Sequence, residues 1–102
     1  MSIVVVTSKP KTLLAAIKKA IDDKDVETWE YDSDGDFTHT PPQWRQKAWL
    51  RPVVQEGQLT FKLLPQKDVS LTNAVNGVYH GRFIEMLVTH FAEQFSSATA
   101  KP

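Results

Sequence analysis

The chain has 102 residues, of which 41% are hydrophobic and 24% are charged, a composition typical of one folded domain of ordinary size. Its 12 basic and 12 acidic residues cancel, so the composition does not predict whole-molecule attraction to nucleic acid or to an anionic membrane. There is no cysteine, which excludes disulfides and leaves the redox compartment undetermined. The sequence has neither a signal-peptide pattern nor an apolar stretch long enough to span a membrane, so we expect a cytoplasmic protein without membrane contact.

The first 31 residues combine strand and helix signals. Residues 3–6 are a β-branched run that predicts a buried strand. Pro10 suits the first turn of a helix, where no backbone N–H is needed, and the apolar spacing after it predicts a helix over residues 10–23. Residues 26–31 alternate in polarity and predict a second strand. A strand, a helix and a strand in this order indicate a right-handed crossover between parallel strands.

The acidic residues are concentrated in the segment that contains the second strand. Eight of the 12 acids lie between Asp22 and Asp36, where Lys24 is the only base, and basic residues flank the segment on both sides. This distribution could present one sign of charge to a partner. We favour the alternative, in which neighbouring elements of the fold neutralise each other.

Residues 46–64 predict a hairpin for which two registers compete. In one register Pro52 faces Phe61, and its missing N–H points away from the hairpin partner. In the other register a glycine bulge shifts the pairing, and the proline removes a ladder hydrogen bond. We favour the first register, in which the proline also makes its strand an edge or bulges it beside its other neighbour. Its pairs are Leu50–Leu63, Pro52–Phe61, Val54–Leu59 and Gln55–Gln58.

The last helix is predicted over residues 74–95, and the small polar residues 96–102 are expected to form a disordered tail. The element order is then β-α-β-β-β-α within a single domain of residues 1–95. This order predicts an α+β fold, a two-layer sandwich in which a four-stranded mixed sheet carries two helices on one face. The candidate N-caps of the last helix are Ser70, Thr72 and Asn73.

The last helix has an apolar arc that is wider than packing on one sheet requires. The stripe predicted as core contains Ile84, Leu87, Val88, Phe91 and Phe95. A second stripe beside it contains Tyr79, Phe83, Met86 and His90. The second stripe fits a protein interface, such as that of a homodimer, because aromatic residues and methionine are enriched at interfaces. We favour the alternative, in which this stripe packs against the first helix on the same face of the sheet.

His80 is the most suggestive single residue, because it lies on the core side of this helix between Gly77 and Gly81. One hypothesis is a ligand or acid–base site near the start of the helix. The alternative is a partly buried histidine that is hydrogen-bonded to a backbone carbonyl. We favour the alternative because no nucleophile or carboxylate accompanies His80 at a matched spacing.

The outer face of the hairpin is basic and contains a tryptophan. Such a surface can contact phosphates and stack a base, so a nucleic-acid-binding module is the alternative function. No nucleic-acid-binding motif accompanies it, and charges on an edge strand also prevent edge-to-edge aggregation, which is the explanation we favour. The residues of this basic face are Arg45, Lys47, Trp49, Arg51 and Lys62.

The sequence gives little support for a metal or a cofactor. Asp32, Asp34 and Asp36 resemble the start of a calcium loop. However, Gly35 is at the fourth position instead of the sixth, and Gln43 stands where the bidentate glutamate is required. The histidines show no zinc spacing. We therefore expect an acidic turn, with no metal and no cofactor.

No catalytic motif is recognisable, whether of serine hydrolases, phosphate-binding loops, dinucleotide-binding folds or zinc proteases. The wide apolar arc of the last helix and the segregated charge instead suit a surface that binds another macromolecule. We therefore predict a small, non-enzymatic binding protein. Its expected partner is another protein or a second copy of itself, with nucleic acid as the alternative.

Overall fold

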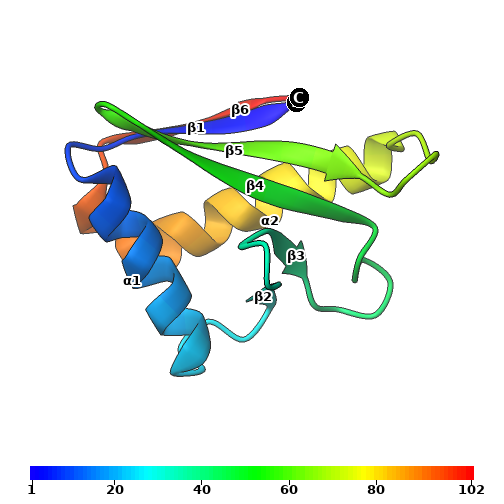
Figure 1. The fold of residues 1–102 in the computed structure, drawn as a ribbon, viewed down its shortest axis with the longest axis horizontal. Coiled ribbons are helices and arrows are strands. Elements are labelled where there is room, and N and C mark those ends of the chain that lie inside the picture. The colour runs from blue at the N-terminus through cyan, green and yellow to red at the C-terminus, as the bar shows by residue number, and fades with distance from the viewer.

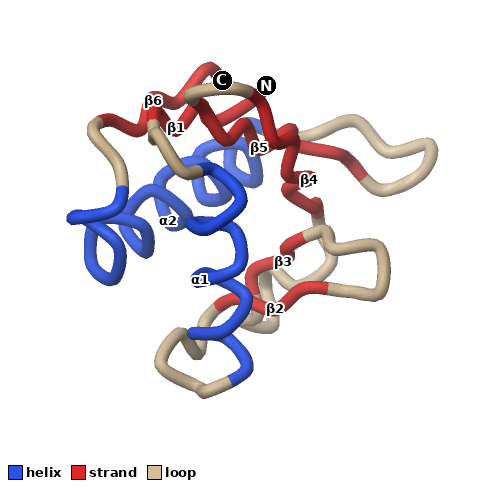
Figure 2. Tube along the Cα trace, turned by 60° about the vertical axis from the view of Figure 1, so that its left-hand side comes forward, coloured by secondary structure: helices blue, strands red, loops and turns tan.

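The chain folds into two helices and a six-stranded antiparallel sheet in a computed structural model that describes residues 1–102 (Figure 1). The strand order across the sheet is β2-β3-β4-β5-β1-β6. Both helices lie on the same side of the sheet, and the two chain ends lie next to each other (Figures 1 and 2). The predicted α+β class is therefore confirmed. In chain order the elements are β1 (Ser2–Val6), α1 (Pro10–Asp22), β2 (Trp29–Tyr31), β3 (Phe37–His39), β4 (Ala48–Gln55), β5 (Gln58–Pro65), α2 (Asn73–Phe91), the 3₁₀ turn η1 (Ala92–Gln94) and β6 (Ser97–Lys101).

The predicted disordered tail is wrong, because residues 97–101 form β6 and pair with β1 in antiparallel register. β1 has β5 on one side, so its other side needs a second partner for its backbone groups. β6 supplies that partner. Ala98 and Ala100 pair with the buried Val5 and Ile3 on the helix-covered face of the sheet. The small side chains of β6 give a weak strand signal, which is why this strand was missed.

The predicted four-stranded mixed sheet and its parallel first pair are also wrong. β1 lies between β5 and β6. β2 is a short strand at the edge of the sheet that is farthest from β6. After α1 the chain turns back through Lys24, whose φ is 63°. The backbone N–H groups of Asp25 and Val26 then both donate to the carbonyl of Ala20. This turn holds the chain against the end of α1, so β2 begins only at Trp29 and does not return beside β1.

The hairpin of β4 and β5 has the favoured register, since Pro52 pairs with Phe61 and Gln55 with Gln58. Gly57 occupies the turn with a φ of 76°, a conformation that side chains disfavour. The contact of β4 with β3 consists of the single ladder pair Phe37–Leu50. The β3 ladder therefore ends before Pro52, as the missing N–H of this residue requires.

Both helices begin close to their predicted positions. Pro10 starts α1, and the hydroxyl of Thr72 caps α2 by accepting a hydrogen bond from the N–H of Val75 at 3.1 Å. α2 ends at Phe91, earlier than predicted, because η1 turns the chain toward β6. Neither helix is long and apolar enough to cross a membrane.

The buried face of α2 includes residues of both stripes. Leu87 and Phe91 of the stripe predicted as core are buried, whereas Val88 of that stripe is 54% exposed. In the second stripe Tyr79 and Phe83 are fully buried and Met86 nearly so. Phe83 packs against aromatic rings of the sheet. The ring centroids of Trp29, Phe37 and Phe61 lie 4.9, 5.8 and 4.6 Å from that of Phe83. This stripe is therefore core and does not form an exposed interface.

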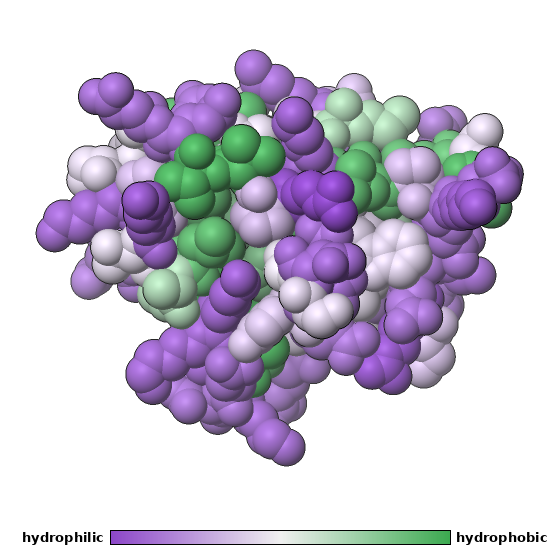
Figure 3. All heavy atoms as spheres, in the orientation of Figure 1, coloured by the Kyte–Doolittle hydropathy of each residue, from purple (hydrophilic) through white to green (hydrophobic).

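Hydrophilic side chains cover most of the molecular face seen in Figure 3. Hydrophobic side chains interrupt them mainly in the upper half of that view. The concealed core contains 17 hydrophobic residues in one cluster, contributed by both helices and by all strands except β6. One such cluster is expected of a domain of this size.

Replacing Phe83 by alanine tests whether the second stripe is core. Loss of a buried ring that contacts three other aromatic rings should lower the free energy of unfolding by about 3–5 kcal/mol. The exposed Val69 serves as control, since Val69→Ala should change it by less than about 0.5 kcal/mol. Urea unfolding of both variants measures the difference. A small effect of Phe83→Ala would contradict the packing described.

Candidate binding cleft around His39

A surface hollow with a volume of about 450 Å³ lies between α2 and the segments on either side of β3. Polar and ionisable side chains dominate its walls. It is formed by the chain before β2, the end of β3, the loop of residues 41–44, and the C-terminal half of α2. The lining residues are Asp25, Val26, Glu27, Thr28, His39, Pro41, Gln43, Trp44, Arg82, Glu85, Met86, Thr89 and His90.

The hydroxyl of Tyr79 holds the walls of the cleft together. Tyr79 is fully buried on α2, and its O–H donates to the carbonyl of Trp44. The same oxygen accepts from the backbone N–H of His39 at 3.3 Å and lies 2.9 Å from the hydroxyl of Thr38. Because the one proton of Tyr79 is used on Trp44, Thr38 is the donor in the last contact. One side chain thus fixes β3 and the following loop against the helix.

His39 is the buried ionisable group of the cleft. Its side chain packs on Trp29, with ring centroids 4.5 Å apart, and the residue is only 5% exposed. Its Nδ1 lies 2.6 Å from the carbonyl oxygen of Thr28, which can only accept, so Nδ1 carries the proton in this contact. Nε2 makes no hydrogen bond within the protein and is not sealed from solvent. The neutral ring therefore offers a lone pair to the cleft.

Burial lowers the pKa of His39 below its ordinary value of 6.5, because the charged ring would lose its hydration. The hydrogen bond to Thr28 opposes this shift, while the positive charge of Arg82 adds to it. The ring is therefore neutral at neutral pH. A neutral imidazole with one N–H fixed by a carbonyl acts as a hydrogen-bond acceptor at its other nitrogen.

The carboxylates of the cleft exceed its fixed positive charges. Asp25 and Glu27 make no side-chain hydrogen bond or ion pair. Glu85 is paired with Arg82 at 3.3 Å, and both side chains are more than half exposed, so that pair is weak. Three residues with carboxylates therefore line the cleft together with one guanidinium, and the half-buried Trp44 is also part of the lining. This combination favours a cationic group.

The residues that the sequence suggested for partner binding do not form a common surface. Tyr79, Phe83 and Met86 are buried, and only His90 of that set is exposed. Met86 and His90 nevertheless line the cleft, on the side of α2 that faces His39.

His80 matches the favoured structural interpretation. It is 4% exposed, and its Nδ1 lies 2.7 Å from the carbonyl of Asn76 on the preceding turn. Its Nε2 has no hydrogen-bond partner and is closed off from solvent. This ring is not open to a ligand.

The basic face suggested for nucleic acid is partly neutralised by carboxylates. Arg45 makes two hydrogen bonds to Glu30. Arg51 likewise binds both carboxylate oxygens of Asp36, at 3.0 and 2.8 Å. Lys62 lies opposite Arg51 on the helix-free face of the sheet. The two remaining residues of the set are Lys47, which is exposed in the loop before β4, and Trp49, which is half-buried opposite Leu64.

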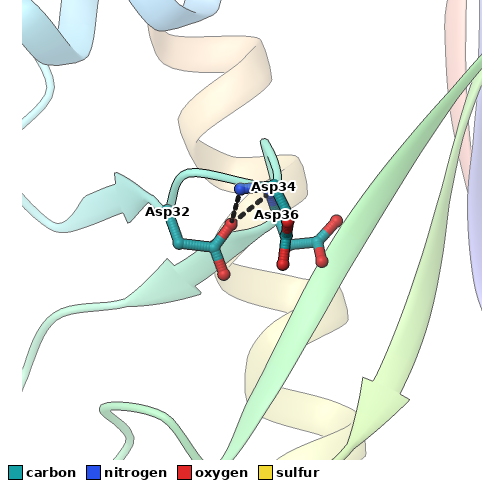
Figure 4. A group of neighbouring side chains, drawn as sticks. All are labelled: Asp32, Asp34 and Asp36. Atoms are coloured by element: carbon teal, nitrogen blue, oxygen red, sulfur yellow. Dashed lines mark hydrogen bonds between the residues drawn. The ribbon is translucent and has the colours of Figure 1, made fainter.

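The three aspartates of the acidic turn lie close together, with possible ligand atoms within 4.8 Å of one another (Figure 4). One carboxylate oxygen of Asp32 accepts from the backbone N–H groups of Asp34 and Asp36, both at 3.0 Å. Both oxygens of Asp36 are used by Arg51. The contacts are those of a hydrogen-bonded turn joined to an ion pair.

The sequence did not single out His39. It contains no spacing that links this residue to Arg82, Glu85 or His90, which lie more than 40 positions later. One signal for the burial of His39 was available. His39 lies two residues after Phe37 in an extended segment, and this spacing places both side chains on the same, buried face.

Comparisons with protein-family models, with curated proteins and with solved structures found no match.

The lowered pKa of His39 predicts a pH dependence of stability. The unfolded chain binds a proton near pH 6.5, before the folded protein does, so the stability contributed by the neutral ring decreases as the pH falls below about 6.5. His39→Gln should reduce this decrease between about pH 7.5 and 5.5. Urea unfolding across this range provides the measurement. Equal pH profiles for wild type and His39→Gln would refute the assignment.

Proposed function

We propose that this protein is a non-enzymatic binding protein whose His39 cleft receives a basic side chain of a protein partner. The observation that carries the proposal is that two unpaired carboxylates, of Asp25 and Glu27, share one cleft with the free Nε2 acceptor of His39. These groups accept hydrogen bonds, and none of them is used by the fold itself.

A guanidinium or ammonium group suits this set of acceptors. An arginine side chain presents five N–H donors in a plane, and its charge is attracted to the carboxylates. The ring of Trp44 at the wall offers a face on which a cation can stack. Arg82 opposes a cation, but its ion pair with Glu85 partly offsets that charge.

A protein partner is supported by the polar walls of the cleft. Pockets for small organic ligands are mostly apolar and bury most of the ligand surface. The cleft instead has few hydrophobic residues, and its carboxylates lie on exposed residues. Such a hollow suits one projecting side chain of a larger partner, with further contacts at its rim.

A binding role is favoured over a catalytic one by the surroundings of His39. Nucleophilic and acid–base sites join the histidine to a hydroxyl, thiol or carboxylate within hydrogen-bond reach. Neither Thr28 nor Thr89 supplies one, since no side chain is hydrogen-bonded to Nε2 and the hydroxyl of Thr89 donates to the carbonyl of Glu85. The free Nε2 is thus an acceptor without a reacting partner in the protein.

Titration with short peptides tests the proposal. NMR signals of His39 and Trp44 should shift with a capped arginine peptide and not with the corresponding glutamate peptide. The double variant Asp25→Asn/Glu27→Gln should weaken binding about two- to thirtyfold, since each exposed ion pair contributes about 0.2–1 kcal/mol.

The double variant Glu56→Gln/Glu93→Gln is the matched control, because it removes the same charge from exposed positions outside the cleft. Its affinity should equal that of the wild type. The proposal fails if the arginine peptide leaves both signals unmoved, or if the control variant loses as much affinity as the cleft variant.

A further inference from the structure

β6 leaves one edge of the sheet without a partner. It pairs with β1 on one side, and the strand order ends there. A strand of this kind presents a row of unpaired N–H and C=O groups that another strand can pair with. Proteins usually block such edges with proline, bulges or charges. Residues 97–101 contain neither a proline nor a bulge, and their one charged side chain is Lys101.

The helix layer also stops short of this edge. Ala100 shares a face of the sheet with the fully buried Ile3, to which it is paired, but is itself exposed. Val88 is 54% exposed on α2, a helix that contacts β6. By helical periodicity Val88 points away from the flank of α2 that carries Arg82 and lines the cleft. Ala100 is therefore uncovered on the unpaired strand, and Val88 is exposed on a helix that contacts this strand.

From these two features we infer that β6 pairs in antiparallel fashion with β6 of a second copy of this chain. A two-fold axis through Thr99 would place Thr99 opposite its own counterpart. Ala98 then faces Ala100 of the second copy, and small side chains let the strands and the layers beneath them approach. The sheet would continue through both copies, with the helices of both on one side, as a closed symmetric dimer requires.

The distribution of charge agrees with a second copy as the occupant. In the register centred on Thr99, each Lys101 lies opposite Ser97 of the other copy, so the charges of the edge do not face each other. The chain has a formal net charge of zero, so two copies do not repel each other over long distances.

This inference is independent of the proposed function. The cleft lies against β3, toward the β2 end of the sheet, whereas β6 is the opposite edge. Both clefts would remain open in the dimer, and failure of one proposal would leave the other intact.

Charge substitutions at Thr99 test both the dimer and its register. Wild type should sediment as a dimer at high micromolar concentration. Thr99→Glu and Thr99→Lys should each weaken the dimer at least about tenfold, because the two-fold axis places like charges directly opposite each other. An equimolar mixture of the two variants should restore dimers, since the opposed charges are then complementary.

Thr12→Glu, on the exposed surface of α1, serves as control and should leave the dimer unchanged. Circular dichroism verifies that each variant is folded. A monomeric wild type would overturn the inference. So would a Thr99→Glu protein that remains dimeric, or a mixture of the Thr99 variants that stays monomeric although both are folded.

Discussion

The hydroxyl of Tyr79 is the contact on which the arrangement around the cleft depends. It lies inside the core on α2, yet all of its hydrogen bonds go to β3 and to the loop that follows β3. A buried hydroxyl without partners would be costly, so α2 and this segment are stable together only when these bonds form. The contact also orients His39, whose backbone N–H is one of the donors. The position of the cleft follows from this requirement of the core.

The fold neutralises much of its segregated charge and leaves part of the rest at the cleft. Asp36 is paired with Arg51 and Glu30 with Arg45, each through two hydrogen bonds. Asp22 accepts from the hydroxyl of Tyr31, and Asp23 is paired with Lys19. The carboxylates of Asp25 and Glu27 have no partner, and both residues line the cleft. Part of the charge that the fold does not use thus lies next to a free imidazole nitrogen.

The sequence was sufficient to predict features that depend on single residues and their close neighbours in the chain. The missing N–H of Pro52 selected the hairpin register, Pro10 marked the start of α1, and the cap at Thr72 was among the expected ones. β6 could not be predicted, because its small side chains carry little strand preference and its pairing is imposed by the open edge of β1.

The candidate site was beyond prediction for a similar reason. His39 and Tyr79 are 40 positions apart, and their contact depends on how the β2–β3 pair packs against α2. The sequence therefore pointed to His80, which lies on the core side of the last helix. In the structure the free nitrogen of His80 is closed off from solvent. Helical periodicity located an apolar arc on α2, but which part of that arc is buried was decided by aromatic rings from β2, β3 and β5.

Hydrogen exchange of the His39 backbone amide in a Tyr79→Phe variant tests the central claim most directly. The substitution keeps the buried ring and removes the hydroxyl that accepts from this amide. The account predicts that the His39 amide exchanges at least about fivefold faster relative to amides of the β4–β5 ladder, since a lost buried hydrogen bond costs about 1–3 kcal/mol. Exchange at His39 that is unchanged, or that changes only in step with the β4–β5 ladder, would contradict it.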